Sequence, residues 1–247
     1  MLNAAHERCM EGLLIRIGAD QTEGGGRWNA PVDANSRRFV YVPIPETKPN
    51  RVGQETPYSM ISPALRAFGC PLPERLSHLR MHLDPDYRFL TYGDRGRKGQ
   101  QIAKMLAEGD LLVFYSGLKD INADTLIYAI VGFFVIERIE RAQEFTGDRA
   151  RQNAHSRRML SNDADDIIVS GKRGVSGRLV TCVPIGGYRS KAYRVYESLL
   201  AAWGGISASG GYLQRSAVFP RLLDARRFLT WWQEQEVELV ADNNPSR

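Results

Sequence analysis

The 247-residue sequence has little cysteine and no long apolar run. Its three cysteines, Cys9, Cys70 and Cys182, lie far apart and show no CxxC spacing, which argues against a disulfide framework and a structural zinc site. The longest apolar run, residues 126–136, is too short to span a bilayer. Charged residues interrupt the apolar patch at the N-terminus, which is not typical of a signal peptide. We therefore expect a cytoplasmic protein with no membrane partner.

The usual nucleotide and hydrolase motifs are also absent. The glycine-rich stretch GADQTEGGGRWN, residues 18–29, lacks the lysine that a phosphate-binding P-loop requires. No GxGxxG follows a predicted strand and no GxSxG turn occurs. These absences argue against a P-loop enzyme, a dinucleotide-binding fold and an α/β-hydrolase, and they leave any cofactor unknown.

Positive charge is what the sequence does have. Lysine and arginine number 33 against 28 acidic residues, a net charge of +5 with a pI near 9.2. The basic residues gather at 95–98, 149–158, 172–178 and 189–194, several of them beside glycines in expected loops. An arginine there can bind two oxygens of one phosphate, so we expect a nucleic acid or a nucleotide as partner.

The apolar residues, 43% of the chain, predict a sizeable core. Their pattern predicts strands at 13–17, 39–42, 111–118, 127–139, 167–171 and 179–185, and helices at 61–69, 100–107, 193–204 and 222–237. Residues 111–118 and 127–139 form the central pair. We predict an α+β (mixed α/β) fold in one domain over residues 1–247, with a bent mixed sheet or partial barrel flanked by helices.

Two aromatic residues lie in segments too polar for an ordinary core. Trp28 ends the glycine loop and Tyr92 lies in TYGDRG, beside the first basic group. A nucleic-acid base gains about 1–3 kcal/mol by stacking on such a ring. We expect the three glycines to let the loop bend and bring Asp20 close to Trp28 and Asn29.

Histidine is scarce, with four residues in the chain. His78 and His82 could share a helical face, but Pro85 follows closely and no HExxH motif is present, so we predict no metal site. His155 precedes an acidic cluster that includes Asp165 and Asp166, and it could transfer protons with one of them. A surface helix end with solvated charges is the alternative interpretation.

Several motifs together resemble a known family. They are RIGAD with GGRWNAP, PIPE, TYGD and NAHSRR. Over about residues 13–220 the chain resembles the nucleotide modification associated domain 3 family of bacteria and their viruses. That family is linked to base modification through the genes that accompany it, so the resemblance implies a setting but no catalytic residues.

A second, shorter resemblance concerns GDLLVFYSG and the following apolar strand with Gly132. This segment is similar to the core of PUA-like and EVE domains, mixed barrels that bind RNA or modified bases in an aromatic pocket. The resemblance implies a PUA-like core at about residues 84–220 and a role in recognising a modified base.

Three functions remain open. In the first, the protein binds nucleic acid or a nucleotide through polar, basic and aromatic residues: Asp20, Trp28, Asn29, Glu46, Tyr92, Asp94, Arg95, Arg97, Lys98, Asn153 and Arg157. In the second, it is a transferase or hydrolase in which His155 works with Asp165 or Asp166, and Asp20, Glu46 or Asp94 supplies a second carboxylate.

In the third, it is a protein-interaction module of a defence or modification system. Trp231 and Trp232 are adjacent in a terminal helix, so both cannot face one core stripe, and one of them could contact a partner. The residues singled out above could equally be turn-formers, caps or loop anchors. The sequence decides neither whether a reaction is catalysed nor whether the partner is DNA, RNA or a free nucleotide.

Overall fold

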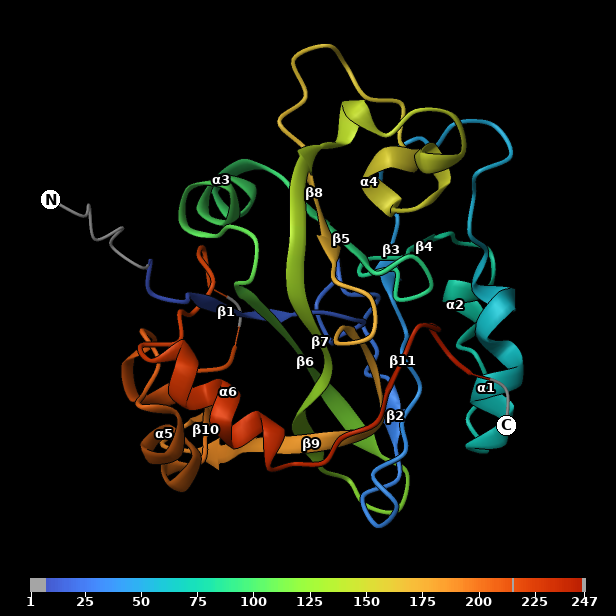
Figure 1. The fold of residues 1–247 in the computed structure, drawn as a ribbon. Coiled ribbons are helices and arrows are strands. Elements are labelled where there is room, and N and C mark those ends of the chain that lie inside the picture. The colour runs from blue at the N-terminus through green and yellow to red at the C-terminus, as the bar shows by residue number, and fades with distance from the viewer. Residues whose placement is uncertain (1–7, 215, 246–247) are drawn as a thin grey trace, which may run out of the picture.

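A large mixed sheet organises the chain (Figure 1). The computed structural model describes residues 8–214 and 216–245. At the centre of the sheet, β6 (Leu111–Asp120) and β7 (Leu126–Arg141) form an antiparallel hairpin. Every β6 residue except Lys119 is buried, as expected of a continuous apolar and aromatic run. The other edge of β7 pairs with β9 (Gly177–Arg189) and β8 (Ile167–Gly171).

The remaining strands extend this core on both sides. β1 (Gly12–Arg16) and β2 (Pro31–Val32) pair in parallel with β6. β5 (Thr91–Asp94) pairs with β8, and β10 (Ala192–Val195) and β11 (Leu239–Val240) pair with β9. Register shifts interrupt the ladders on both edges of β7, and such bulges bend strands. The α+β prediction with a bent mixed sheet is confirmed, and the strands of the described ranges do not close into a barrel.

A separate two-stranded ladder joins β3 (Ile44–Pro45) to β4 (Met81–His82). The helices lie around the sheet: α1 (Ser62–Ala67), α2 (Glu74–Ser77), α3 (Gly96–Met105), α4 (Ala154–Arg157), α5 (Glu197–Trp203) and α6 (Ala225–Gln233). The 3-10 turns within the described residues are η1 (Tyr58–Ile61), η2 (Ala142–Glu144), η3 (Gly147–Arg151) and η4 (Ser209–Gly211). In Figure 1, α5 and α6 lie beside β9 and β10, whereas α3 and α4 lie near β5 and β8.

Two predicted elements are wrong. Residues 39–42 are buried but form no strand, since only Phe39 makes an isolated bridge, to Val32 of β2. The predicted helix at 193–204 begins only at Glu197, because residues 192–195 form β10. There Tyr193 stacks on Tyr128 of β7 at 4.4 Å between ring centres, a cross-sheet contact that overrides the helical pattern.

The two adjacent tryptophans both pack inside the chain. Trp232 stacks on Phe133 of β7 with ring centres 4.7 Å apart, while Trp231 lies edge-on to Trp203 of α5 at 5.0 Å. One tryptophan thus fixes α6 to the sheet and the other fixes it to α5. The pair therefore lends no support to an interaction surface built on it.

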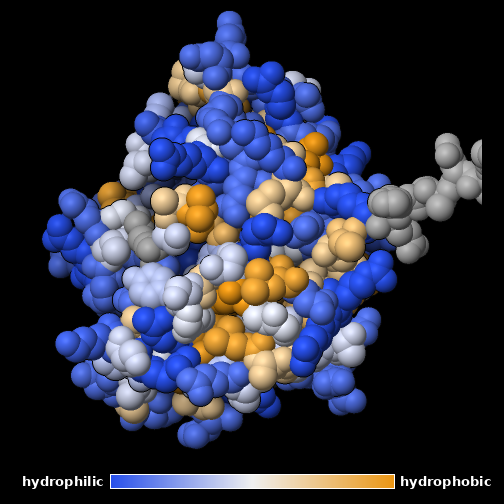
Figure 2. Space-filling view, turned by 90° about the vertical axis from the view of Figure 1, so that its left-hand side faces the viewer, coloured by the Kyte–Doolittle hydropathy of each residue, from blue (hydrophilic) through white to orange (hydrophobic). Residues whose placement is uncertain are grey.

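The outer surface is mostly hydrophilic on the face shown in Figure 2, with apolar side chains gathered near its middle. Over residues 8–214 and 216–245, no helix has the length and apolar character needed to cross a membrane.

The core depends on close contact between Tyr87 and the backbone of β7. The Tyr87 ring makes edge contacts with Phe114 and Phe134, at 6.0 and 5.9 Å between ring centres. A Cβ atom on Gly132 would lie 2.1 Å from the Tyr87 hydroxyl and 2.5 Å from its ring carbons. Only glycine leaves room for the ring at this point of the strand.

We therefore predict that Gly132→Ala lowers the free energy of unfolding by about 1–3 kcal/mol, because the buried ring must move away. Urea denaturation followed by circular dichroism measures this change. Gly24→Ala is the matched control, since a Cβ there meets no atom within 4 Å. Equal stability of the two variants would contradict the packing described.

Candidate functional site

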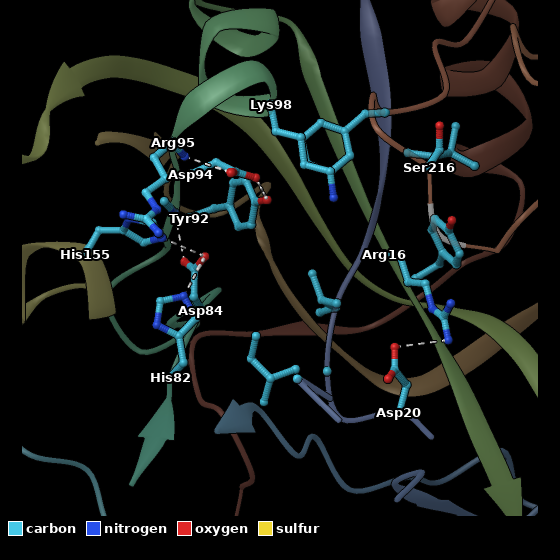
Figure 3. A pocket seen from close by; sticks show the side chains of 18 of the residues that line it. Arg16, Asp20, His82, Asp84, Tyr92, Asp94, Arg95, Lys98, His155 and Ser216 are labelled. Carbon is cyan, nitrogen blue, oxygen red and sulfur yellow. Dashed lines mark hydrogen bonds and ion pairs between the residues drawn. The ribbon is translucent and has the colours of Figure 1, made fainter. Parts of the chain in front are cut away.

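A pocket of about 550 Å³ lies where β1, β5, the start of α3 and residues 214 and 216–220 meet. Figure 3 shows two facing walls: Tyr92, Asp94 and His155 belong to one, and Arg16 and Asp20 to the other. The volume lies within the range of small-molecule sites in proteins.

Hydrogen bonds fix Phe219 and Pro220 against the rest of the pocket. The Gln101 side chain of α3 donates to the carbonyl oxygen of Phe219 at 2.9 Å and accepts from its backbone N–H at 2.8 Å. The backbone N–H of Leu14 in β1 donates to the carbonyl oxygen of Pro220 at 2.9 Å. Phe219 and Pro220 therefore join α3 to β1 at the edge of the pocket.

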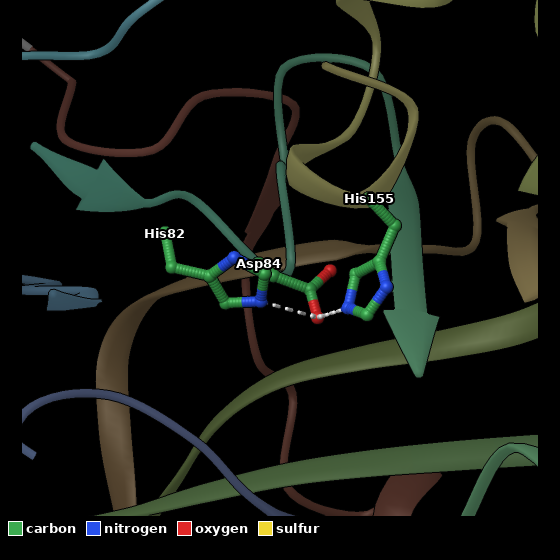
Figure 4. A group of neighbouring side chains, drawn as sticks. All are labelled: His82, Asp84 and His155. Carbon is green, nitrogen blue, oxygen red and sulfur yellow. Dashed lines mark ion pairs between the residues drawn. The ribbon is translucent and has the colours of Figure 1, made fainter. Parts of the chain in front are cut away.

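Two histidines and an aspartate face one another in the wall of the pocket (Figure 4). The Nε2 atoms of His82 and His155 each lie 3.9 Å from Oδ2 of Asp84. One ligand atom from each residue can be chosen so that all three lie within 4.8 Å of one another. All three side chains are at least 90% buried. We call these three residues the His–Asp–His cluster.

A carboxylate is hydrogen-bonded to Nδ1 of each histidine, the ring nitrogen farther from Asp84. Nδ1 of His82 is 2.7 Å from Oε2 of Glu46, and Nδ1 of His155 is 2.5 Å from Oδ1 of Asp166. An ionised carboxylate only accepts, so each Nδ1 carries the proton. With neutral rings, both Nε2 lone pairs point toward Asp84.

Arg158 links these two carboxylates. Its guanidinium donates to both oxygens of Glu46, at 2.9 and 3.2 Å, and its Nη1 lies 3.5 Å from Oδ1 of Asp166. A bidentate arginine contact of this kind is among the stronger ion pairs. Arg158 therefore stabilises the charged form of both acids.

Asp84 is oriented by donors on its other oxygen. The Asn153 side chain and the backbone N–H of Gly93 both donate to Oδ1 at 2.8 Å, which leaves Oδ2 facing the histidines. Asn153 also caps α4, because its side-chain oxygen accepts from the backbone N–H of His155 and Ser156 completes the capping box. One amide thus positions both Asp84 and His155.

Burial shifts the acid–base properties of the cluster. It raises the pKa of Asp84 to about 7 and lowers the pKa of His155 to about 4, because each charged form loses solvation. Burial also acts to raise the pKa of Glu46, but hydrogen bonds and charges from His82 and Arg158 outweigh it and bring that pKa to about 2. A buried cluster with pKa values shifted in this way can transfer protons or bind a cation.

Cationic side chains line the pocket beside the cluster. Arg95 and Lys98 come from the start of α3, and Lys98 Nζ lies 4.7 Å from the centre of the Phe219 ring. Arg16 lies on the facing wall, with its guanidinium 3.4 Å from the Asp20 carboxylate. The pocket therefore combines positive charge with the buried His–Asp–His cluster.

The structure brings about half of the predicted site residues into this pocket. Those that line it are Asp20, Tyr92, Asp94, Arg95, Lys98 and His155. Three more do not line the pocket but hydrogen-bond to residues that do: Glu46, Asn153 and Asp166. Of the two acids proposed as partners of His155, Asp166 makes the contact, whereas Asp165 is exposed and accepts from the backbone N–H of Gly96.

Other predicted residues do not line the pocket. Trp28 packs against the core, and its backbone N–H donates to the carbonyl oxygen of Asp20. Asn29 is buried and donates to the carbonyl oxygen of Gly117 at 2.6 Å. Arg97 is exposed, and Arg157 is buried in an ion pair with Asp86 at 2.5 Å. The loop thus joins Asp20 and Trp28 through the backbone, without bringing the indole into the site.

Sequence reasoning missed His82, Asp84 and Arg158 as site residues. His82 was compared with His78, but His78 is exposed at the end of α2, and the histidine that meets His82 is His155. A local signal was present, because His82 and Asp84 are two residues apart in an extended segment and so point to one side. Their partner on α4 could not be read from spacing.

Comparison with known families agrees with this part of the chain. The model of the family described as nucleotide modification associated domain 3 matches residues 12–210, and the chain belongs to that family. No curated protein and no solved structure matches this chain. The matched range includes every member of the His–Asp–His cluster and the three residues that hydrogen-bond to it, Glu46, Asn153 and Asp166.

We predict that Arg157 is structural. Arg157→Ala leaves the Asp86 carboxylate buried without its charged partner and should lower the free energy of unfolding by about 3–5 kcal/mol. Denaturant unfolding measures this loss. Arg97→Ala, an exposed arginine, is expected to stay within about 0.5 kcal/mol of the wild type. If both variants are as stable as the wild type, the buried pair does not have the role described.

Proposed function

We propose that this protein is a nucleotide-modifying enzyme whose pocket binds a nucleotide, either free or within a nucleic acid. One observation carries the proposal: the buried His–Asp–His cluster lies in the wall of the same pocket that presents Arg95 and Lys98. Membership of the nucleotide modification associated domain 3 family supports the same setting.

The cationic wall suits a phosphate group. Arg95 is exposed and can donate two hydrogen bonds to one phosphate, while Lys98 supplies a point charge beside it. The Arg16–Asp20 pair on the facing wall remains for the sugar and base. A volume of about 550 Å³ accommodates a mononucleotide.

An enzyme fits this pocket better than a passive reader of modified bases. A reader needs an open aromatic face, but Trp28 does not line the pocket. Tyr92 is 5% exposed, its hydroxyl donates to Asp94 and its ring packs on Phe114. Burying several carboxylates and histidines costs stability, and such groups with shifted pKa values are typical of active sites.

We predict that the wild-type protein binds deoxynucleoside 5′-monophosphates and that Lys98→Ala weakens binding about tenfold or more, because a charge-assisted contact is lost. Isothermal titration with the four monophosphates, and with the matching nucleosides as controls, measures this. Arg97→Ala lies on the same helix outside the pocket and should bind like the wild type. No binding to any monophosphate, or equal losses in both variants, would contradict the proposed site.

The catalytic part is tested separately with Asp84→Asn. This variant keeps an oxygen to accept from Asn153 and Gly93 but loses the carboxylate charge. We expect altered nucleosides in digests of DNA, RNA or nucleotide pools from cells that express the wild type, and none from cells that express Asp84→Asn. Mass spectrometry of the digests makes the comparison, and identical profiles would argue for a binding protein.

A further inference from the structure

We propose that the His–Asp–His cluster binds one divalent transition-metal ion through Nε2 of His82, Oδ2 of Asp84 and Nε2 of His155. The role of the ion in a reaction rests on the proposed function, whereas its binding does not. The three ligands come from β4, from the segment after it and from α4.

The spacing of the three atoms fits a common ion. Ligand atoms at about 2.1 Å from a metal lie about 3.0–3.5 Å from each other. Here each Nε2 is 3.9 Å from Oδ2 of Asp84, and the three atoms lie within 4.8 Å of one another. Small rotations of the side chains would bring all three atoms within bonding distance of one ion.

The surroundings of the three ligands are those of a metal site. A histidine that binds a metal usually donates its other ring N–H to a carboxylate or a carbonyl, which fixes the ring and makes Nε2 more basic. Glu46 and Asp166 do this for His82 and His155. Donors to Oδ1 hold Asp84 so that Oδ2 faces both rings.

A cluster in which the three residues hydrogen-bond to one another, with no metal ion, explains the geometry less well. The two approaches of 3.9 Å are too long for hydrogen bonds, so the three polar atoms face one another without direct contact. The guanidinium of Arg158 contacts the carboxylates of Glu46 and Asp166, whereas Asp84 faces the two histidines. A divalent cation between Asp84 and the rings would bring positive charge to the Asp84 carboxylate and satisfy both Nε2 lone pairs.

The ligand types narrow the choice of metal. Two imidazoles and one carboxylate suit Zn²⁺, Fe²⁺, Mn²⁺ or Co²⁺ rather than Mg²⁺, which prefers oxygen ligands. Three protein ligands leave further positions for water or for an oxygen of a bound molecule. His82, Asp84 and His155 all line the pocket, so those positions would face a nucleotide there. His155 would then act as a ligand and not as a general base.

The test uses the full chain after treatment with EDTA and dialysis. Co²⁺ is followed by its visible absorption and Zn²⁺ by isothermal titration. We expect one ion per chain, and a loss of affinity of more than about 100-fold in Asp84→Asn and in His82→Ala. Glu46→Gln should lose about 10–100-fold, because it removes the charge behind His82 and beside Arg158 but leaves the three ligands in place. Circular dichroism and thermal melting report whether each variant is folded.

His78→Ala is the matched control, because His78 is exposed and lies four residues before His82. It should bind Co²⁺ and Zn²⁺ like the wild type. The proposal is overturned if the wild type binds neither ion, or if folded Asp84→Asn binds both as tightly as His78→Ala. Nucleotide binding without ion binding would overturn this inference alone, and ion binding without nucleotide binding would overturn only the proposed function.

Discussion

The candidate site depends on the ion pairs that the guanidinium of Arg158 makes. The guanidinium is buried, and it pairs with both Glu46 and Asp166, the two carboxylates that fix the histidine rings. Without this charge the two acids would be buried with one positive partner fewer, and the cost of desolvating them would favour their protonation. A protonated acid no longer stabilises a ring N–H donor in the same way. The orientation of both histidines is therefore tied to one arginine.

The backbone brings Arg158 and Glu46 together. Residues 157–159 bond to residues 49–51: the N–H of Arg51 donates to the carbonyl oxygen of Arg157, and the N–H of Met159 donates to that of Pro49. On the other side, the β3–β4 ladder places Glu46 beside His82. The connection after β3 thus contributes to the site although it contains little regular structure. Its prolines explain why it follows an extended path.

The sequence patterns that predicted the fold correctly are those that depend on local chemistry. A continuous apolar run such as residues 111–118 can only be buried, so the β6–β7 pair was predictable. The segment 192–195 was not, because its strand character comes from Tyr193 stacking on a distant strand. Local patterns also linked His155 to Asp166, which is eleven residues away. Its contact with His82 is a product of the whole fold and has no counterpart in sequence spacing.

Several residues that line the pocket follow the part of the chain that the family model matches. The match ends at residue 210, whereas Gln214, Ser216 and Phe219 lie beyond it. The His–Asp–His cluster and the Arg16–Asp20 pair therefore lie within the matched part of the chain, whereas these three lining residues lie after it. Replacing Gln214, Ser216 or Phe219 would reshape the space available to a ligand while leaving the His–Asp–His cluster, and the acids behind it, in place. The size of the pocket can therefore change independently of its reactive groups.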